Sequence, residues 1–110
     1  ELLHGFAGSV YAKQELKIYD VDILNAIKYH TIGRRGMTIL EKIIYLSDAI
    51  EPSRNYPNVD LIREKAITCI NEAILFEVDK KLKHLLEIHA TIHPNTVDMR
   101  NCIIGEIGKN

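Results

Sequence analysis

The 110-residue sequence predicts an all-α protein that forms one domain over residues 1–110. Apolar residues recur at intervals of three and four through most of the chain, as they do on one face of a helix. No stretch of useful length shows the alternation of apolar and polar residues that marks a strand. Capping residues, prolines and glycines divide the helical pattern into segments, so we expect several short helices around one core.

The first two helices are expected in the N-terminal third of the chain. Residues 2–16 carry an apolar stripe that includes Phe6 and Val10. Asp20 has the side chain of an N-cap and precedes a second apolar stripe, and Gly33 stands just beyond the end of that stripe. We therefore expect one helix within residues 2–16 and another that starts after Asp20.

A third helix is expected to run from Thr38 to the residue before Pro52. Thr38 with Glu41 three residues later is a capping-box sequence, and Pro52 ends the helical pattern. Asp48 then lies in the last turn, where the helix dipole disfavours a carboxylate by roughly 0.3–1 kcal/mol. Apolar neighbours indicate that Asp48 is buried, so a cation should lie beside it. This cation is either a metal ion or Arg54, and the spacing alone favours an Asp48–Arg54 ion pair.

Helical pattern resumes near Asn58, after a loop rich in proline, asparagine and serine, and continues to residue 89. We expect either two helices or one long bent helix there, with a solvated lysine run on its surface. The lysines of this run are Lys80, Lys81 and Lys83. A final helix should be capped by Asn95 or Thr96, and residues 105–110 should fray.

Bulk composition excludes some classes of function. The net charge is −1, and the chain has no tryptophan and two phenylalanines, so we expect neither a broad basic surface for nucleic acid or membranes nor a set of stacking platforms. No apolar run approaches the roughly 18 residues that a membrane-spanning helix needs. Cys69 and Cys102 are far apart and form no CxxC motif, so we interpret both as reduced thiols of a cytoplasmic protein.

The segment from His30 to Arg35 concentrates polar chemistry on one turn. His30 supplies an imidazole, Thr31 supplies a hydroxyl, and the two arginines supply guanidinium groups that match anions. Gly33 allows the backbone to approach a ligand closely. This combination suits a phosphate beside a metal ion, but a histidine in the last turn of a helix is also a common dipole-favoured cap. Both interpretations of His30 remain open at this point.

The central segment, residues 29–57, reads YHTIGRRGMTILEKIIYLSDAIEPSRNYP. It resembles the YqeK family of HD-domain proteins, which are bacterial symmetrical hydrolases of diadenosine tetraphosphate. The resemblance extends to LLHG at residues 2–5, to IHPNT at residues 92–96 and to MRN at residues 99–101, so it covers nearly the whole chain. It implies an HD-domain-like helical bundle. The family's first histidine and its His-Asp pair lie upstream of LLHG, so we expect this chain to be the C-terminal portion of a bundle that is incomplete at the N-terminus.

The resemblance also implies a reaction and a site. Proteins of the family use a two-metal centre of the iron type, a divalent or mixed-valence pair, to cleave diadenosine tetraphosphate into two ADP. The implied metal ligands are His4, His30 and Asp48, and Asp48 is also the implied catalytic residue. The implied contacts with the nucleotide come from these three residues and from Thr31, Arg34, Arg54, His93 and Thr96. Arg34 fits the family's HTxGR pattern, whereas Arg35 is interpreted as solvated.

Two other functions remain open on the sequence. The chain could be an HD-type phosphohydrolase of another nucleotide, which a panel of substrates would distinguish. It could also be a non-catalytic, nucleotide-binding helical domain that keeps the pocket without the metals. The expected partners are a dinucleoside polyphosphate and its ADP product, without nucleic acid or membrane, and a homodimer is left open.

Overall fold

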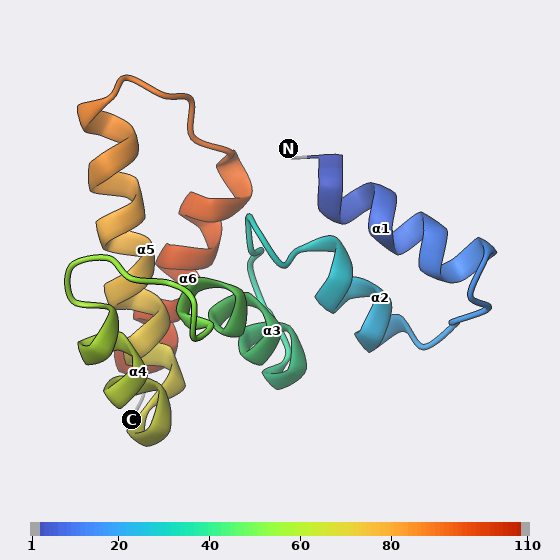
Figure 1. The fold of residues 1–110 in the computed structure, drawn as a ribbon, viewed down its shortest axis with the longest axis horizontal. Helices are drawn as coiled ribbons and strands as arrows, with labels where there is room; N and C mark the ends of the chain where they lie inside the picture. Colours follow the sequence, from blue (N-terminus) through green and yellow to red (C-terminus); the bar gives the residue numbers. More distant parts are fainter. Residues whose placement is uncertain (1–2, 109–110) are drawn as a thin grey trace.

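The computed structural model describes residues 3–108, with side chains from Gly5 onwards, and shows six α-helices in this range (Figure 1). No strand occurs among the described residues, so the all-α prediction is confirmed. The helices are α1 (Leu3–Gln14), α2 (Val21–Lys28), α3 (Ile39–Ile50), α4 (Val59–Thr68), α5 (Ile70–Glu87) and α6 (Pro94–Gly108). None of these six helices combines the length and the apolar character needed to cross a bilayer.

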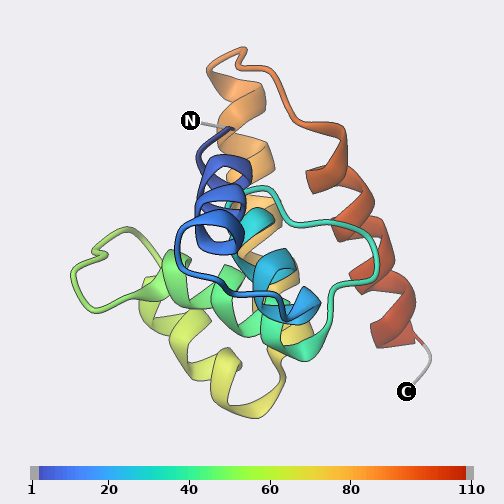
Figure 2. The same ribbon diagram turned by 90° about the vertical axis from the view of Figure 1, so that its right-hand side faces the viewer.

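The helices form two groups. α3 to α6 surround the hydrophobic core, to which they contribute Tyr45, Ile62, Ile74 and Met99 respectively. α1 packs against α2 alone among the described helices, and α2 joins this pair to the rest of the molecule by packing on α3. Figure 1 shows α1 and α2 to one side of the other four helices, and in Figure 2, viewed from that side, the pair lies in front of them. The loop between α2 and α3 therefore connects the two groups.

Both N-caps predicted in the N-terminal half are present. The Asp20 carboxylate accepts hydrogen bonds from two backbone N–H groups in the first turn of α2, at 2.9 and 3.2 Å. The Thr38 hydroxyl accepts one from the N–H of Glu41 (3.3 Å) at the start of α3. The Glu41 carboxylate bonds to Arg34 instead of returning to Thr38, so the capping box is half formed.

The helical region after Asn58 consists of two helices, α4 and α5. Cys69 between them has extended backbone angles (φ −154°, ψ 103°), which interrupt the helix. The interruption allows α4 to fold back against α5, and Ile62 and Ile74 become fully buried. Of the two alternatives left open by the sequence, the bent single helix is therefore wrong.

The start and the end of α6 both differ from the prediction. α6 begins at Pro94, and Nδ1 of His93 accepts a hydrogen bond from the N–H of Asn95 (3.1 Å). His93 thus takes the capping role predicted for Asn95 or Thr96, and proline occupies the first helical position, where its missing N–H has no cost. α6 continues to Gly108, so residues 105–108 are helical rather than frayed.

Candidate functional site

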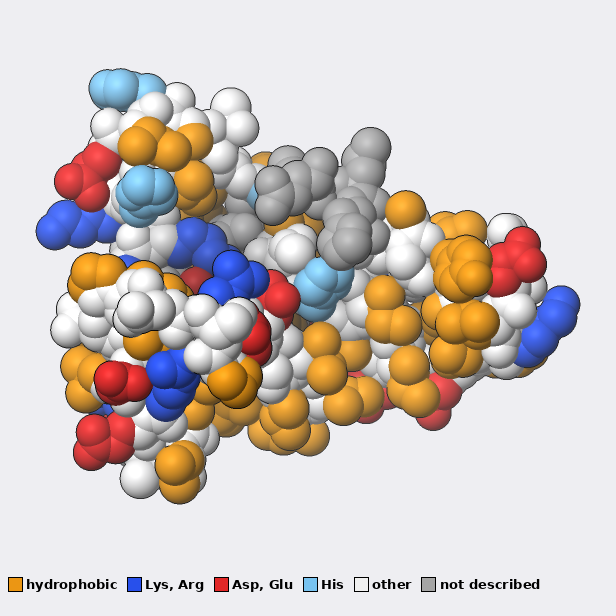
Figure 3. Space-filling model, viewed as in Figure 1, with side chains coloured by type: hydrophobic (Ala, Val, Ile, Leu, Met, Phe, Trp, Pro, Cys, Tyr) orange, Lys and Arg blue, Asp and Glu red, His pale blue; other side chains and the backbone are white. Residues whose placement is uncertain are grey.

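A pocket of about 510 Å³ opens between the end of α2, the end of α3 and the middle of α5. Four of the residues predicted for the site line it, namely His30, Thr31, Asp48 and Arg54. The other lining residues are Ile32, Tyr45, Ala49, Tyr56, Glu77, Lys81, Leu85 and Thr91. In Figure 3, basic, acidic and histidine side chains gather near the middle of the face shown. The fold therefore brings the His30 turn and the end of α3 to one place.

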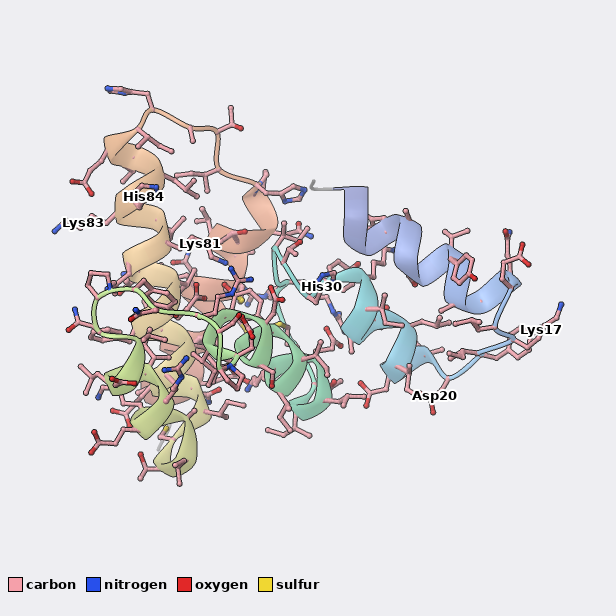
Figure 4. The ribbon with its side chains drawn as sticks, viewed as in Figure 1. Lys17, Asp20, His30, Lys81, Lys83 and His84 are labelled. Atoms are coloured by element: carbon pink, nitrogen blue, oxygen red, sulfur yellow. The ribbon has the colours of Figure 1, made fainter. Side chains whose placement is uncertain are left out.

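His30 lies in the turn that follows α2, and a backbone contact fixes its ring. Its Nδ1 lies 2.6 Å from the carbonyl oxygen of Ile27, so Nδ1 carries the proton and donates it. The lone pair of the neutral ring is then on Nε2, as in metal-ligating histidines whose other nitrogen donates to a carbonyl. Figure 4 shows His30 where the chain leaves α2 for the rest of the molecule. His30 thus caps a carbonyl of α2, and this bond fixes the orientation of its imidazole ring.

Asp48 lies in the last turn of α3, as predicted, but its side chain is 50% exposed, so the expectation of burial is wrong. Ile44, one turn earlier on the same face, is itself 38% exposed. Tyr45, three residues earlier, is 2% exposed and belongs to the core, so Asp48 lies at the boundary between the buried and the exposed side of α3. Because this carboxylate remains partly hydrated, holding it at the pocket avoids the large desolvation cost of a buried charge.

Arg54 folds back over the end of α3 after the turn at Pro52. Its Nε donates to the backbone carbonyl of Asp48 (3.2 Å), and its Nη2 lies 3.9 Å from the Asp48 carboxylate. Its Nε also lies 3.5 Å from Glu51, whose pKa is lowered by two hydrogen bonds from Ser53 and, to a smaller extent, by the charge of Arg54. An ion pair between half-exposed side chains contributes at most about 1 kcal/mol. The Asp48–Arg54 pair is thus present but loose, and both groups remain accessible from the pocket.

Arg34, which was predicted to bind phosphate, is not among the residues that line the pocket. Its Nε and Nη2 donate to the two carboxylate oxygens of Glu41 at 2.7 and 2.6 Å. The Glu41 side chain is 1% exposed, and its hydrogen bond raises the pKa of Arg34. The guanidinium also lies over the ring of Tyr29, 5.2 Å from its centroid. Arg34 therefore neutralises a buried carboxylate, and Arg35 beside it is exposed, as expected.

The turn at residues 92–96 supports the His30 loop instead of lining the pocket. Thr96 is 5% exposed, and its hydroxyl donates to the carbonyl oxygen of Ile32 (2.8 Å). The Nδ1 of His93 is engaged in capping α6. Thr96 thus holds the loop that carries His30 and Thr31, and neither Thr96 nor His93 lines the pocket, so their predicted contacts with the nucleotide stay predictions.

Gly33 also helps the loop that carries His30 to pack against α6. Its φ is +72°, and a Cβ atom at this position would lie 2.2 Å from the Sδ of Met99 on α6. Glycine is therefore required here because the loop passes tightly against α6. The prediction that Gly33 lets the backbone approach a ligand is independent of this steric requirement and stays a prediction.

The sequence interpretation missed the wall of the pocket that α5 provides. Lys81, expected to be solvated, donates from Nζ to the hydroxyl of Tyr45 (2.6 Å) and lies 3.6 Å from the carboxylate of Glu77. Burial, followed by the negative charge of Glu77, raises the pKa of Tyr45 well above its usual value. A signal was present, because Lys81 follows the fully buried Ile74 and Val78 at helical spacing and so falls on the apolar face of α5.

The described residues fit part of a metal centre. His30 and Asp48 offer an imidazole nitrogen and carboxylate oxygens to the same pocket, and both are ligand types that divalent transition metals accept. The side chain of His4, the third predicted ligand, lies outside the described residues. Among the side chains that the structure describes, no group of three or more histidine, cysteine, aspartate or glutamate residues is arranged to hold a metal. The described donor set is therefore compatible with a metal but smaller than a full coordination shell.

Comparison with known proteins relates the chain to one group of hydrolases. It is 42% identical over 106 residues to a symmetrical bis(5'-nucleosyl)-tetraphosphatase of Halalkalibacterium halodurans, which matches 96% of this chain and 57% of that protein. It is 39% identical over 104 residues to the protein of the same name from Bacillus subtilis, with 94% of this chain and 56% of that protein matched. No protein-family model matches the chain.

A solved structure shows the same fold. The crystal structure of a Clostridium acetobutylicum protein, described as a predicted HD superfamily hydrolase involved in NAD metabolism, superposes with a TM-score of 0.92 and 43% sequence identity. The match covers 94% of this chain and 55% of that one. The all-α HD-like fold is thereby confirmed. The chain spans little more than half of the length of each of these relatives.

Proposed function

Because this chain belongs to the YqeK-like family of HD-domain proteins over the part of their length that it spans, we propose that it contributes to the active site of a symmetrical diadenosine tetraphosphate hydrolase. The observation that carries the proposal is the meeting of His30, Thr31, Asp48 and Arg54 in one pocket. An imidazole, a carboxylate, a hydroxyl and a guanidinium are the groups that a metal-dependent phosphohydrolase needs. The proposed enzyme is cytoplasmic and acts on free nucleotides.

The reaction adds one water across the central phosphoanhydride of diadenosine tetraphosphate and releases two ADP. Negative charge on the non-bridging phosphoryl oxygens must be neutralised, and Arg54 offers a half-exposed planar guanidinium for this purpose. Thr31 supplies a hydroxyl that can donate to a phosphoryl oxygen. Both groups come from the segments that follow α2 and α3, and both line the pocket together with His30 and Asp48.

His30 and Asp48 are the described residues of this chain that would hold a metal. A divalent or mixed-valence metal pair, for which we propose iron, would supply a bound water of lowered pKa and a Lewis acid for the phosphoryl oxygens. Asp48, which the sequence marked as catalytic, would act through this coordination, and the Nδ1 bond of His30 to Ile27 would keep the imidazole oriented. The remaining ligands are His4 and, we propose, a histidine and a His-Asp pair in the half of the family fold that this chain does not span.

The test is the product pattern of the complete polypeptide with diadenosine tetraphosphate. Separation of the nucleotides by chromatography should give ADP as the nucleotide product, and a chelator should abolish the reaction and lower the melting temperature, since a bound metal stabilises the native state. Formation of AMP and ATP instead would show asymmetric cleavage and contradict the proposal. A substrate panel with other nucleotides identifies the alternative, an HD-type phosphohydrolase of different specificity, and a polypeptide that binds nucleotide without metal or turnover supports the non-catalytic alternative.

A further inference from the structure

Lys81 differs from Lys83, which belongs to the same lysine run on α5. Figure 4 shows Lys83 pointing away from the molecule on the outer side of α5, whereas Lys81 lies on the side that faces α3 and the His30 loop. Lys83 is exposed, and Lys81 is partly buried with 32% of its side chain accessible. Its ammonium group lies 4.6 Å from the centroid of the Tyr45 ring and lines the pocket. Lys81 therefore brings a positive charge into the pocket from a position of α5 at which the helical pattern predicts an apolar residue.

The ammonium group of Lys81 makes one short contact and two long contacts with oxygen atoms of the protein. It carries three N–H donors, and its one short contact is with the Tyr45 hydroxyl at 2.6 Å. Its distance to the carbonyl oxygen of Thr31 is 3.4 Å, and its distance to the Glu77 carboxylate is 3.6 Å. Charge-assisted N–H···O bonds are normally 2.7–2.9 Å long, so these two contacts are long for a cation. An anionic oxygen in the pocket could form a shorter bond than either of them.

Lys81 and Arg54 contact neighbouring positions on one face of α3. Lys81 contacts Tyr45, and Arg54 contacts Asp48, which follows Tyr45 by three residues and so lies on the same side of the helix. Lys81 also approaches the backbone of Thr31, next to His30. The pocket thus holds two cationic side chains, one at the end of α3 and one on α5, with His30 and Asp48 among the other lining residues. The carboxylates of Asp48 and Glu77 line the pocket too, so the match depends on the separate positions of the two cations, which allow two phosphoryl groups of one ligand to be bound at once.

We propose that Lys81 is a second phosphate-binding residue of the pocket, which contacts a phosphoryl group other than the one held by Arg54. This inference rests on the proposed function, because it assigns a contact within the same site to a polyphosphate chain. Lys81 would exchange its long contact with Glu77 for a short one with a phosphoryl oxygen, while its bond to Tyr45 keeps the ammonium in place. The ligand chemistry it selects is a nucleotide with two or more phosphates in a row.

The test compares Lys81→Met with Lys83→Met in the complete polypeptide. Both changes remove one positive charge from the same helix and keep an unbranched side chain, but Lys83 is exposed and points away from the molecule. In calorimetric titration, Lys81→Met should lower the affinity for ADP by roughly tenfold or more, as expected for the loss of a charge-assisted hydrogen bond. Lys83→Met should leave the affinity for ADP unchanged. Titration with adenosine, which has no phosphate, should give the same affinity in both variants. Lys81→Arg should retain most of the ADP affinity because it keeps the charge.

The outcomes separate this inference from the proposed function. If the unaltered polypeptide cleaves diadenosine tetraphosphate into ADP but Lys81→Met binds ADP as well as Lys83→Met does, the inference is wrong and the function stands. If Lys81→Met weakens adenosine and ADP equally, Lys81 shapes the pocket through Tyr45 and does not bind phosphate, which also overturns the inference. If the unaltered polypeptide neither binds ADP nor cleaves the dinucleotide, the proposed function itself fails.

Discussion

An arginine–carboxylate pair lies at each end of α3, and the two pairs differ in the distance between the charged groups and in the exposure of the carboxylate. At the first turn, Arg34 donates two short hydrogen bonds of 2.6 and 2.7 Å to the Glu41 carboxylate, and the Glu41 side chain is 1% exposed. At the last turn, Arg54 and Asp48 are 3.9 Å apart, and both side chains are half exposed. A buried and saturated pair supports the fold, whereas a loose pair at a pocket leaves both partners able to bind a ligand.

The largest expected effect comes from Asp48→Asn in the complete polypeptide. The substitution keeps the shape of the side chain but removes a metal-ligand charge, so hydrolysis of diadenosine tetraphosphate should fall by about a hundredfold or more. Metal content, measured by elemental analysis, should fall with it. The melting temperature of the metal-free forms should be unchanged, because the ion pair with Arg54 is exposed. Full metal content together with a clear loss of stability would instead make Asp48 a structural partner of Arg54.

Removing the Arg34 guanidinium should lower the stability of the protein, whereas Asp48→Asn should lower its activity and metal content. Arg34→Met leaves the Glu41 carboxylate buried without its cation, which should lower the free energy of unfolding by about 2 kcal/mol. Denaturant titration measures this change. Arg35→Met is the matched control, because Arg35 is the exposed neighbour and its loss should be nearly neutral. A rise in the Michaelis constant at unchanged stability would return Arg34 to the phosphate-binding role that the sequence suggested.

The smallest of the three effects is expected for Arg54→Lys. The lysine keeps the positive charge but loses the planar fork that matches a phosphoryl group, so the Michaelis constant for diadenosine tetraphosphate should rise about tenfold. Steady-state kinetics together with elemental analysis should show this rise at unchanged metal content, and Arg35→Lys should behave as the unaltered protein does. Loss of metal in Arg54→Lys would indicate that Arg54 maintains the geometry of Asp48.

The features that the sequence by itself determined depend on neighbours a few residues apart. The N-caps at Asp20 and Thr38 are local, since each side chain bonds to backbone groups two or three residues later. The position of Asp48 in the last turn follows from the cap at Thr38 and the stop at Pro52. The apolar periodicity of each segment was enough to predict a wholly helical fold.

Only the tertiary structure decided which charged and polar groups face the pocket. The sequence predicted a phosphate-binding role for both Arg34 and Arg54. In the structure, Arg34 pairs with the buried Glu41 carboxylate, whereas Arg54 lies at the pocket. Lys81 meets Tyr45 across 36 residues, and Thr96 supports Ile32 across 64. Such contacts depend on how the helices pack, and a helical pattern specifies which face is apolar without specifying what lies opposite it. The position of Lys81 at the pocket therefore depends on Tyr45, which helix packing places beside it.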